Sequence, residues 1–229
     1  MLNAEDAALL AEARTRLTGI QTHLPHEIPA AGVSKIAKIP FNAVCCREGL
    51  IWRAEELARS ACDSFEKLDM VAGISLTRAF FETAAALWHL KETIDRQLNN
   101  GIEEDLELQI QRAILGHGSH AHMPRPINVL TFVDRLAKTF PAARNKYDAM
   151  SEYAHPNWMG AAFPFSIIDR ENLVVTFGRG LRGADFHAKL GLTCLIDGLH
   201  VSEVAYNGIA DLLPQFIKLC EEDITRRKP

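Results

Sequence analysis

The chain has 229 residues, of which 48% are hydrophobic and 24% charged, and its formal net charge is −4. This length and composition are typical of one globular domain whose core is large enough to need no disulfide or metal support. The negative charge excludes a protein held on nucleic acid by its overall charge, and it leaves a local basic patch open.

Cysteine usage and the N-terminal sequence predict a cytoplasmic protein. The five cysteines are an odd number, and no two have Cys-x-x-Cys spacing. Adjacent Cys45 and Cys46 would point about 100° apart on a helix, which suits neither a disulfide nor a metal clamp, so we expect buried thiols in a reducing compartment. We expect neither a signal peptide nor a membrane partner, because charges interrupt every apolar run before the ~20 residues of a membrane span.

Apolar periodicity and capping residues predict four helices in the first half of the chain. Asn3 begins the first and Gly19 ends it, and the proline-containing residues 19–40 then form a loop. Asp69 caps a second long helix, which Asn99-Asn100-Gly101 ends. The expected helical ranges are 3–19, 41–68, 69–98 and 103–115.

Two further helices are expected before residue 156. Asn128 caps a helix that reaches Phe140, and Pro141 opens the next one at its first turn. That helix ends near Ala154, because the residue before Pro156 is pushed out of the α region.

The period then changes from helical to alternating. Residues 163–168 and 173–177 are rich in β-branched and aromatic residues and flank a polar turn, which predicts a β-hairpin. A last helix is expected from about residue 185 to 213, with a kink at Pro214 and a continuation to about residue 223.

These elements predict a mainly α fold: a helical bundle of about six to seven helices with one β-hairpin inserted before the C-terminal helix. We expect a single domain over residues 1–229. Its parts are an N-terminal helix and loop (1–40), a helical core (41–160), the hairpin and a glycine-rich turn (161–183) and the C-terminal helix (184–229).

The segment 75–90 predicts a mostly buried helix that carries three polar side chains on one stripe. At 100° per residue, Glu82 lies about 40° and His89 about 20° from Arg78. Charges that face a core are costly unless they are paired and hydrogen-bonded, so we expect Arg78 and Glu82 to bond to each other or to line a polar site. The alternative is an ordinary i,i+4 ion pair on a partly solvated face, with His89 at the surface or satisfied in the core.

A second polar stripe ends the helix predicted before the hairpin. Tyr147, Ser151 and His155 are spaced four residues apart along one helix edge, and the helix dipole at the C-terminus favours the protonated form of His155. In one interpretation these residues lock the helix end. In the other they meet Arg78 and Glu82 across a helix pair and form a polar pocket, although serine and histidine at this spacing are not by themselves a hydrolase signature.

The Arg-x-x-x-Glu helix and the later Tyr…Ser-x-x-x-His-Pro segment together resemble a group of uncharacterised bacterial helical proteins, described only as a domain of unknown function. The likeness covers mainly residues 70–98 and 144–177. It implies a helical bundle and assigns no activity.

A wider resemblance is to the HEPN helical nucleases, whose active site uses Arg-Asn or Arg-Asp followed closely by His on a late helix. Arg144-Asn145 begins in this way, but the next histidine is His155, farther along than in the family pattern. The resemblance implies a metal-independent ribonuclease in which His155 is the acid and base, and Arg78 or Arg144 stabilises phosphate charge.

Two loops carry weaker signals. His117, His120 and His122 lie in the loop 116–124 and have a residue type that binds zinc, copper or nickel, but no acidic or cysteine partner lies nearby, so a solvated loop is the favoured interpretation. Residues 178–183 read GRGLRG, a literal GxGxxG.

A dinucleotide site at GRGLRG would need a second parallel strand after the following helix, and the sequence offers none. We therefore expect no bound nicotinamide cofactor and interpret the segment as a turn. Weak anion binding by Arg179, Arg182 and the following helix N-terminus is left open.

Two main classes of function follow. The first is a binding or structural helical-bundle protein, monomeric or a homodimer, with a small polar ligand near His155, Arg78 and Glu82. The second is the HEPN-like ribonuclease, whose partner would be RNA, and a weaker third is a metal protein using the histidine loop. No cofactor is expected, and whether the protein is an enzyme stays open from sequence alone.

Overall fold

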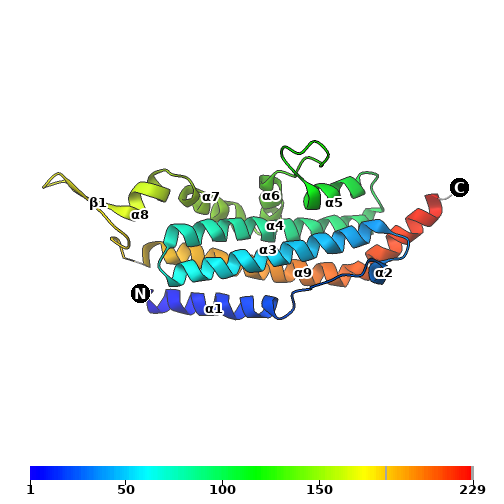
Figure 1. The fold of residues 1–229 in the computed structure, drawn as a ribbon, viewed down its shortest axis with the longest axis horizontal. Coiled ribbons are helices and arrows are strands. Elements are labelled where there is room, and N and C mark those ends of the chain that lie inside the picture. The colour runs from blue at the N-terminus through cyan, green and yellow to red at the C-terminus, as the bar shows by residue number, and fades with distance from the viewer. Residues whose placement is uncertain (184, 228–229) are drawn as a thin grey trace.

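The computed structural model describes residues 1–183 and 185–227, without the side chains of residues 185 and 186. Within this part the chain is a bundle of helices with one two-stranded β-hairpin before the C-terminal helix, so the predicted mainly α fold is confirmed (Figure 1). The predicted C-terminal segment spans residues 184–229. Residues 184, 228 and 229 of that segment lie outside the described residues.

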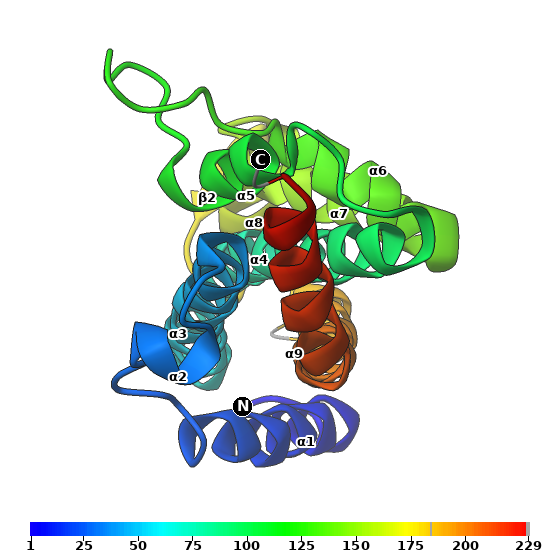
Figure 2. The ribbon, with the colours of Figure 1, turned by 90° about the vertical axis from the view of Figure 1, so that its right-hand side faces the viewer.

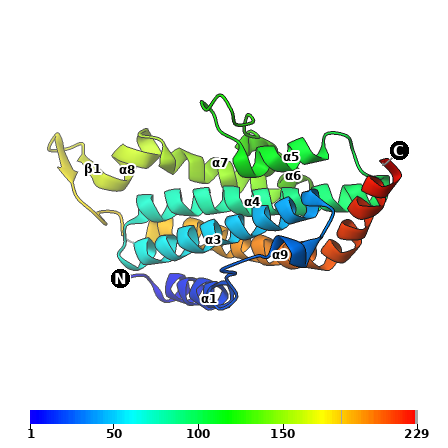
Figure 3. The ribbon, with the colours of Figure 1, turned by 45° about the vertical axis from the view of Figure 1, so that its right-hand side comes forward.

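Three long helices, α3, α4 and α9, form the centre of the bundle and pack against one another. Figure 2 shows α1 below α3 and α9. Helices α6 and α7 lie on the opposite side of the bundle, where they contact α4 (Figure 3). The helices are α1 (Ala4–Gln21), α2 (Ala30–Val33), α3 (Lys38–Glu66), α4 (Met70–Asn100), α5 (Leu106–Leu115), α6 (Val129–Thr139), α7 (Ala142–Ala154), η1 (Trp158–Ala162), α8 (Phe163–Phe165) and α9 (Asp185–Arg227). The strands are β1 (Ser166–Asp169) and β2 (Val174–Phe177), which pair antiparallel.

Close approach of α9 to its neighbours depends on two glycines. A Cβ atom placed on Gly191 would lie 2.4 Å from Cζ of Phe65, and one placed on Gly198 would lie 2.6 Å from Cε1 of Phe80. Both phenylalanines are fully buried. The aromatic rings of α3 and α4 therefore pack directly on the bare backbone of α9, as close-packed interiors require.

The central helix α4 is long and apolar enough to cross a membrane by length and composition. In the structure, 56% of its apolar window is buried inside the bundle, and the helix contacts α3, α9, α6 and α7. The core helix of a globular bundle has this same pattern, and one such helix is weak evidence for a membrane span.

Most predicted helix ends are confirmed in the first half of the chain, and three details differ. The helix expected from residue 41 begins at Lys38, because Pro40 lies in its first turn, where a missing N–H is tolerated. The residues expected to form a loop include the short helix α2. Asp69 lies at the N-cap of α4 as predicted, but its side chain makes no capping bond and pairs with Arg179 instead.

The region before the hairpin differs from the sequence prediction. The strand expected over 163–168 begins only at Ser166, because residues 158–162 form a π-helical turn and Phe163–Phe165 continue it as α8. The side chain of Asn157 accepts bonds from the backbone N–H groups of Met159 and Gly160, which starts a helical turn at this point. Pro164 then suits a first helical turn.

The last helix continues through Pro214 as predicted, and the ribbon shows its C-terminal part inclined to the rest (Figure 1). It ends at Arg227, a little beyond the predicted residue 223. The lost hydrogen bond at the proline does not end the helix, because Ile209 and Phe216 on either side of it are fully buried.

Substitution of Gly198 tests the close approach of α9. Gly198→Ala should lower the free energy of unfolding by about 1–3 kcal/mol, because the added methyl group must displace the buried ring of Phe80. Gly208→Ala is the matched control on the same helix, since its Cβ would meet only the mobile end of Lys91, and helix propensity should make it neutral or stabilising by about 1 kcal/mol. Urea denaturation measures both, and equal effects of the two substitutions would contradict the packing described.

Candidate functional site

The two polar stripes predicted from the sequence meet between α4 and α7. Arg78 donates from Nε to Oγ of Ser151 at 3.0 Å and from NH2 to the hydroxyl of Tyr147 at 2.7 Å. The Tyr147 hydroxyl donates in turn to Oε1 of Glu82 at 2.9 Å, and Arg78 lies 3.2 Å from the same carboxylate oxygen. We call Arg78, Glu82, Tyr147 and Ser151 the α4–α7 cluster.

The polar groups of the α4–α7 cluster bond chiefly to one another. The side chains of Arg78 and Glu82 are 28% and 22% exposed, and the ring of Tyr147 is buried with the Arg78 guanidinium 5.0 Å from its centre. Burial raises the pKa of Tyr147, the bond from Arg78 lowers it, and Glu82 raises it again. The hydroxyl is therefore protonated and holds the two charges together, which is the role of a cross-brace between helices.

His155 does not join this cluster. It is exposed and caps α7 with extended backbone angles, φ −92° and ψ 143°. The residue before a proline is forced out of the helical region, so its side chain leaves the edge that Tyr147 and Ser151 share. Within the described residues, no hydrogen bond links the His155 ring to Arg78 or to Arg144, so His155 is not part of the bonded group that Arg78 forms.

Arg144 is likewise engaged elsewhere. It bonds to Asp148 at 2.9 Å and to Asp134 at 2.6 Å, on the exposed side of α6 and α7. Its neighbour Asn145 and the distant His155 take no part in those bonds.

His89, the third member of the α4 stripe, bonds to a different helix. Its Nδ1 lies 3.1 Å from NH1 of Arg135 on α6, and its ring lies 5.0 Å from that of Phe132. Burial lowers the pKa of His89 to about 4, with Arg135 and Arg96 contributing, so the ring is neutral at pH 7. Nδ1 then accepts the bond from the guanidinium, and His89 is a satisfied core histidine.

A second Arg–Glu–Tyr group, which sequence spacing did not reveal, braces α3 to α9. Tyr206 donates to Oε2 of Glu48 at 2.7 Å, and Arg47 donates to the other oxygen of the same carboxylate. Burial and the bond to Glu48 raise the pKa of Tyr206 to about 12. The partners lie 158 residues apart in sequence, so no local pattern relates them.

The histidine loop is organised by its own backbone. Nδ1 of His117 accepts bonds from the N–H groups of Ser119 and His120, and the rings of His120 and His122 meet edge to face at 6.0 Å. Among the described residues, no three His, Cys, Asp or Glu side chains are placed to hold a metal ion.

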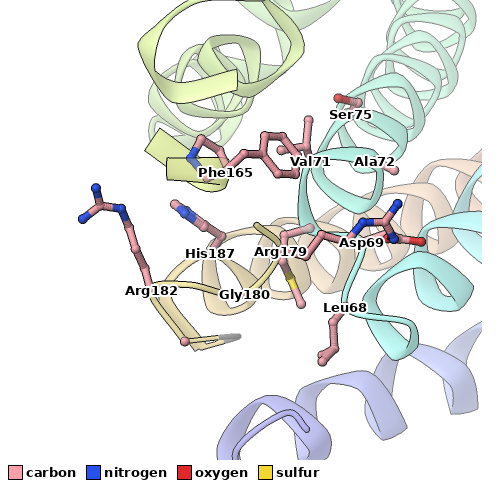
Figure 4. A pocket seen from close by; sticks show the side chains of 13 residues that line it. Leu68, Asp69, Val71, Ala72, Ser75, Phe165, Arg179, Gly180, Arg182 and His187 are labelled. Carbon is pink, nitrogen blue, oxygen red and sulfur yellow. The ribbon is translucent and has the colours of Figure 1, made fainter. Parts of the chain in front are cut away.

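The glycine-rich turn 178–183 borders a pocket of about 450 Å³ at one end of the bundle (Figure 4). The strand before it belongs to an antiparallel hairpin, and Gly180 and Gly183 have positive φ angles of 65° and 85°, so it is a tight turn rather than part of a βαβ unit. Four segments line the pocket: the start of α4, α8, this turn and the start of α9. The lining residues are Leu68, Asp69, Met70, Val71, Ala72, Ser75, Pro164, Phe165, Arg179, Gly180, Arg182, Gly183 and His187.

Charged groups lie at the rim of this pocket. NH1 of Arg179 bonds to Asp69 at 2.9 Å, and in Figure 4 the two side chains lie together. Arg182 donates to the carbonyl oxygens of Phe163 and Ser166, both at 3.0 Å, and stacks 4.1 Å above the ring of Phe163. These bonds tie the turn to α4 on one side and to the hairpin base on the other.

His187 closes the inner wall of the pocket. Its Nδ1 lies 2.7 Å from the hydroxyl of buried Tyr153, and its ring contacts that of Phe163. Burial lowers the pKa of His187, and the charge of Arg182 lowers it further. Neither His187 nor Tyr153 was predicted as a site residue, because nothing in the spacing of α7 and α9 shows that they meet.

Comparisons with protein-family models, with curated proteins and with solved structures gave no match for this chain. The resemblances drawn from short motifs therefore stay predictions.

Tyr147→Phe tests the cross-brace. Removal of the hydroxyl should lower the free energy of unfolding by about 1–3 kcal/mol, because hydrogen bonds to both Arg78 and Glu82 are lost. A double-mutant cycle with Glu82→Gln, measured by urea denaturation, should give a coupling above about 0.5 kcal/mol. A coupling near zero would mean that the two side chains do not support each other in solution.

Histidine substitution tests the pH dependence of stability. Since the pKa of His89 falls from 6.5 to about 4 on folding, the unfolded chain binds this proton first, and stability is lost as the pH falls from about 6.5 towards 4. The loss of unfolding free energy that comes from protonating His89 is at most about 3 kcal/mol, and it should not occur in His89→Gln. Denaturation midpoints at pH 7 and pH 4.5 measure it, with the exposed His155→Gln as control. An unchanged pH slope in His89→Gln would contradict the assignment.

Proposed function

We propose that this protein binds a small, largely apolar molecule carrying one anionic group, in the pocket beside the N-terminus of α4. The main support for this proposal is the pocket itself, because its volume of about 450 Å³ lies in the usual range for small-molecule sites. Ligand sites typically combine apolar walls with a few polar groups that fix orientation, and this lining has the same character.

The apolar wall is built from two segments. Leu68, Met70 and Val71 provide it at the start of α4, and Pro164 and Phe165 of α8 face them across the pocket. In Figure 4 the ring of Phe165 lies beside Val71. An alkyl or aromatic body fits such a surface by the hydrophobic effect.

The polar rim supports an anionic rather than a cationic group. Arg179 and Arg182 outnumber Asp69, the single carboxylate among the lining residues. The first turn of α4 receives no side-chain cap, so its N–H groups and the positive end of the helix dipole add to the attraction for an anion. Ser75, one turn farther along, supplies a hydroxyl.

The ribonuclease alternative lacks a supporting contact. It requires His155 and an arginine at one accessible cleft, and in the described residues Arg78 bonds to Tyr147 and Ser151 while Arg144 bonds to aspartates. Binding without catalysis is therefore the function we favour.

A cytoplasmic location accompanies this proposal. All five cysteines are free thiols, and burial raises the pKa of Cys46, Cys194 and Cys220 to about 12. Unpaired, unreactive thiols suit a reducing compartment.

Binding is tested with three probes that share one alkyl chain: decyl phosphate, decanoate and decanol. Titration calorimetry on the full chain should show the two anions binding more tightly than decanol. Arg179→Ala should weaken the binding of decyl phosphate by about tenfold and leave the binding of decanol unchanged, because only the bond from the arginine to the anionic group is lost. Lys218→Ala, on α9 outside the pocket lining, is the charge control.

A pocket-filling variant separates this site from general surface binding. Ala72→Phe should abolish binding of all three probes, whereas Ala210→Phe, an exposed position of α9 outside the pocket lining, should not. Unchanged binding in Ala72→Phe, or no preference of the wild type for the anions, would contradict the proposal.

A further inference from the structure

A second pocket lies where α1 packs against α3 and α9 (Figure 2), and we call it the α1–α9 pocket. Its volume is about 470 Å³, within the usual range for small-molecule sites. It shares no lining residue with the pocket beside α4. The lining residues of the α1–α9 pocket are Thr15, Arg16, Gly19, Ile20, His23, Ile51, Leu199, Glu203, Tyr206 and Asn207.

The floor of the α1–α9 pocket is apolar and held in place. Ile51 of α3 and Leu199 of α9 are buried, and the ring of Tyr206 lies with them in the lining. The Tyr206 hydroxyl donates to Glu48 at 2.7 Å, and the Arg47 guanidinium lies 4.5 Å from the ring centre. Walls that are already fixed lose little conformational freedom when a ligand binds, so this floor suits an apolar group.

Two opposite charges stand at the rim of the pocket. NH1 of Arg16 on α1 lies 3.5 Å from Oε2 of Glu203 on α9, and the two side chains are 35% and 58% exposed. This distance is longer than the ~2.7–2.9 Å of a charged hydrogen bond. The Arg16 guanidinium is anchored through Nε, which donates to Glu12 at 3.0 Å. An exposed ion pair of this length adds little stability, so a ligand can bond to both groups at small cost.

The charge balance of the rim favours a ligand that carries both signs. Arg16 and Glu203 are the only Arg, Lys, Asp or Glu side chains in the described lining of this pocket. A ligand with one charge is attracted by one of these groups and repelled by the other, whereas a zwitterion is attracted by both. An α-amino acid carries its ammonium and carboxylate groups on one carbon atom, which suits two opposite charges that lie close together.

Uncharged groups supply further acceptors for an ammonium, which has three N–H donors. The Thr15 hydroxyl donates to the carbonyl of Ala11 at 2.9 Å and keeps its lone pairs for accepting. Nδ1 of His23 lies 2.9 Å from the carbonyl of Gly19, which can only accept, so Nδ1 carries the hydrogen and Nε2 of the neutral ring is an acceptor. The amide of Asn207 can both donate and accept.

We propose that the α1–α9 pocket binds an α-amino acid with an apolar side chain. Its carboxylate bonds to Arg16 and its ammonium to Glu203. Its side chain lies on the floor formed by Ile51, Leu199 and Tyr206. This site is separate from the pocket beside α4, where arginines outnumber carboxylates and an anion is expected.

Three probes that share one phenethyl body test the ligand class: L-phenylalanine, 3-phenylpropionate, which lacks the ammonium, and phenethylamine, which lacks the carboxylate. Titration calorimetry on the full chain at pH 7 should show phenylalanine binding about tenfold more tightly than either of the others. Each titration is repeated in Ala72→Phe, which fills the pocket beside α4 and removes any 3-phenylpropionate bound there. Phenylalanine binding should be the same in both backgrounds, whether or not the pocket beside α4 binds anions.

Two charge substitutions test which residues hold the amino acid. Glu203→Gln should weaken phenylalanine binding by about tenfold without weakening 3-phenylpropionate, and Arg16→Gln should weaken it similarly without weakening phenethylamine. Glu222→Gln, an exposed position of α9 outside the lining, is the matched control and should change nothing. Urea denaturation confirms that the variants stay folded.

Several outcomes would overturn the amino-acid site. No binding of phenylalanine, or equal binding of the three probes, would mean that the paired charges recognise no zwitterion. A loss of phenylalanine binding in only one of the two charge variants would indicate a ligand held by a single charge. Unchanged phenylalanine binding in both variants would place the bound amino acid elsewhere on the protein.

Discussion

The packing of aromatic rings on glycine backbone sets the spacing of the whole bundle. Because Phe65 and Phe80 lie against Gly191 and Gly198, α9 approaches α3 and α4 more closely than side chains would otherwise permit. This contact fixes α4 at the centre of the molecule. The α4–α7 cluster and the pocket then depend on where α4 begins and which of its faces is covered.

The first turn of α4 and its later turns have different roles for that reason. Its first turn stays open and forms part of the pocket floor, while Arg78 and Glu82, farther along, are covered by α7 and held by Tyr147. A tyrosine hydroxyl between an arginine and a glutamate satisfies both charges in a partly buried setting, where an isolated charge would be costly. The same chemistry recurs in Arg47, Glu48 and Tyr206 between α3 and α9.

The pocket and the hairpin share their supports. Arg182 binds the carbonyls of Phe163 and Ser166, so one side chain holds the pocket rim, α8 and the first residue of β1 together. His187 and Tyr153 connect this region to α7 and thus to the braced part of the bundle. A ligand in the pocket would contact the base of the hairpin through Phe165 and Arg182.

The sequence by itself determined the helical fold, the order of its elements and several of their ends, because caps, prolines and apolar periods act locally. Asn128 caps α6 and Gly101 ends α4 as their types dictate. It also indicated that Arg78 and Glu82 would bond to each other or line a polar site, and it left an ordinary i,i+4 ion pair on a partly solvated face as the alternative. Only the tertiary structure decided that the partners are Tyr147 and Ser151 and that His155 turns away, because one backbone torsion before a proline redirects that side chain. It likewise decided where the pocket lies, since the start of α4 is far in sequence from α8, the glycine-rich turn and the start of α9, and only packing brings it to them.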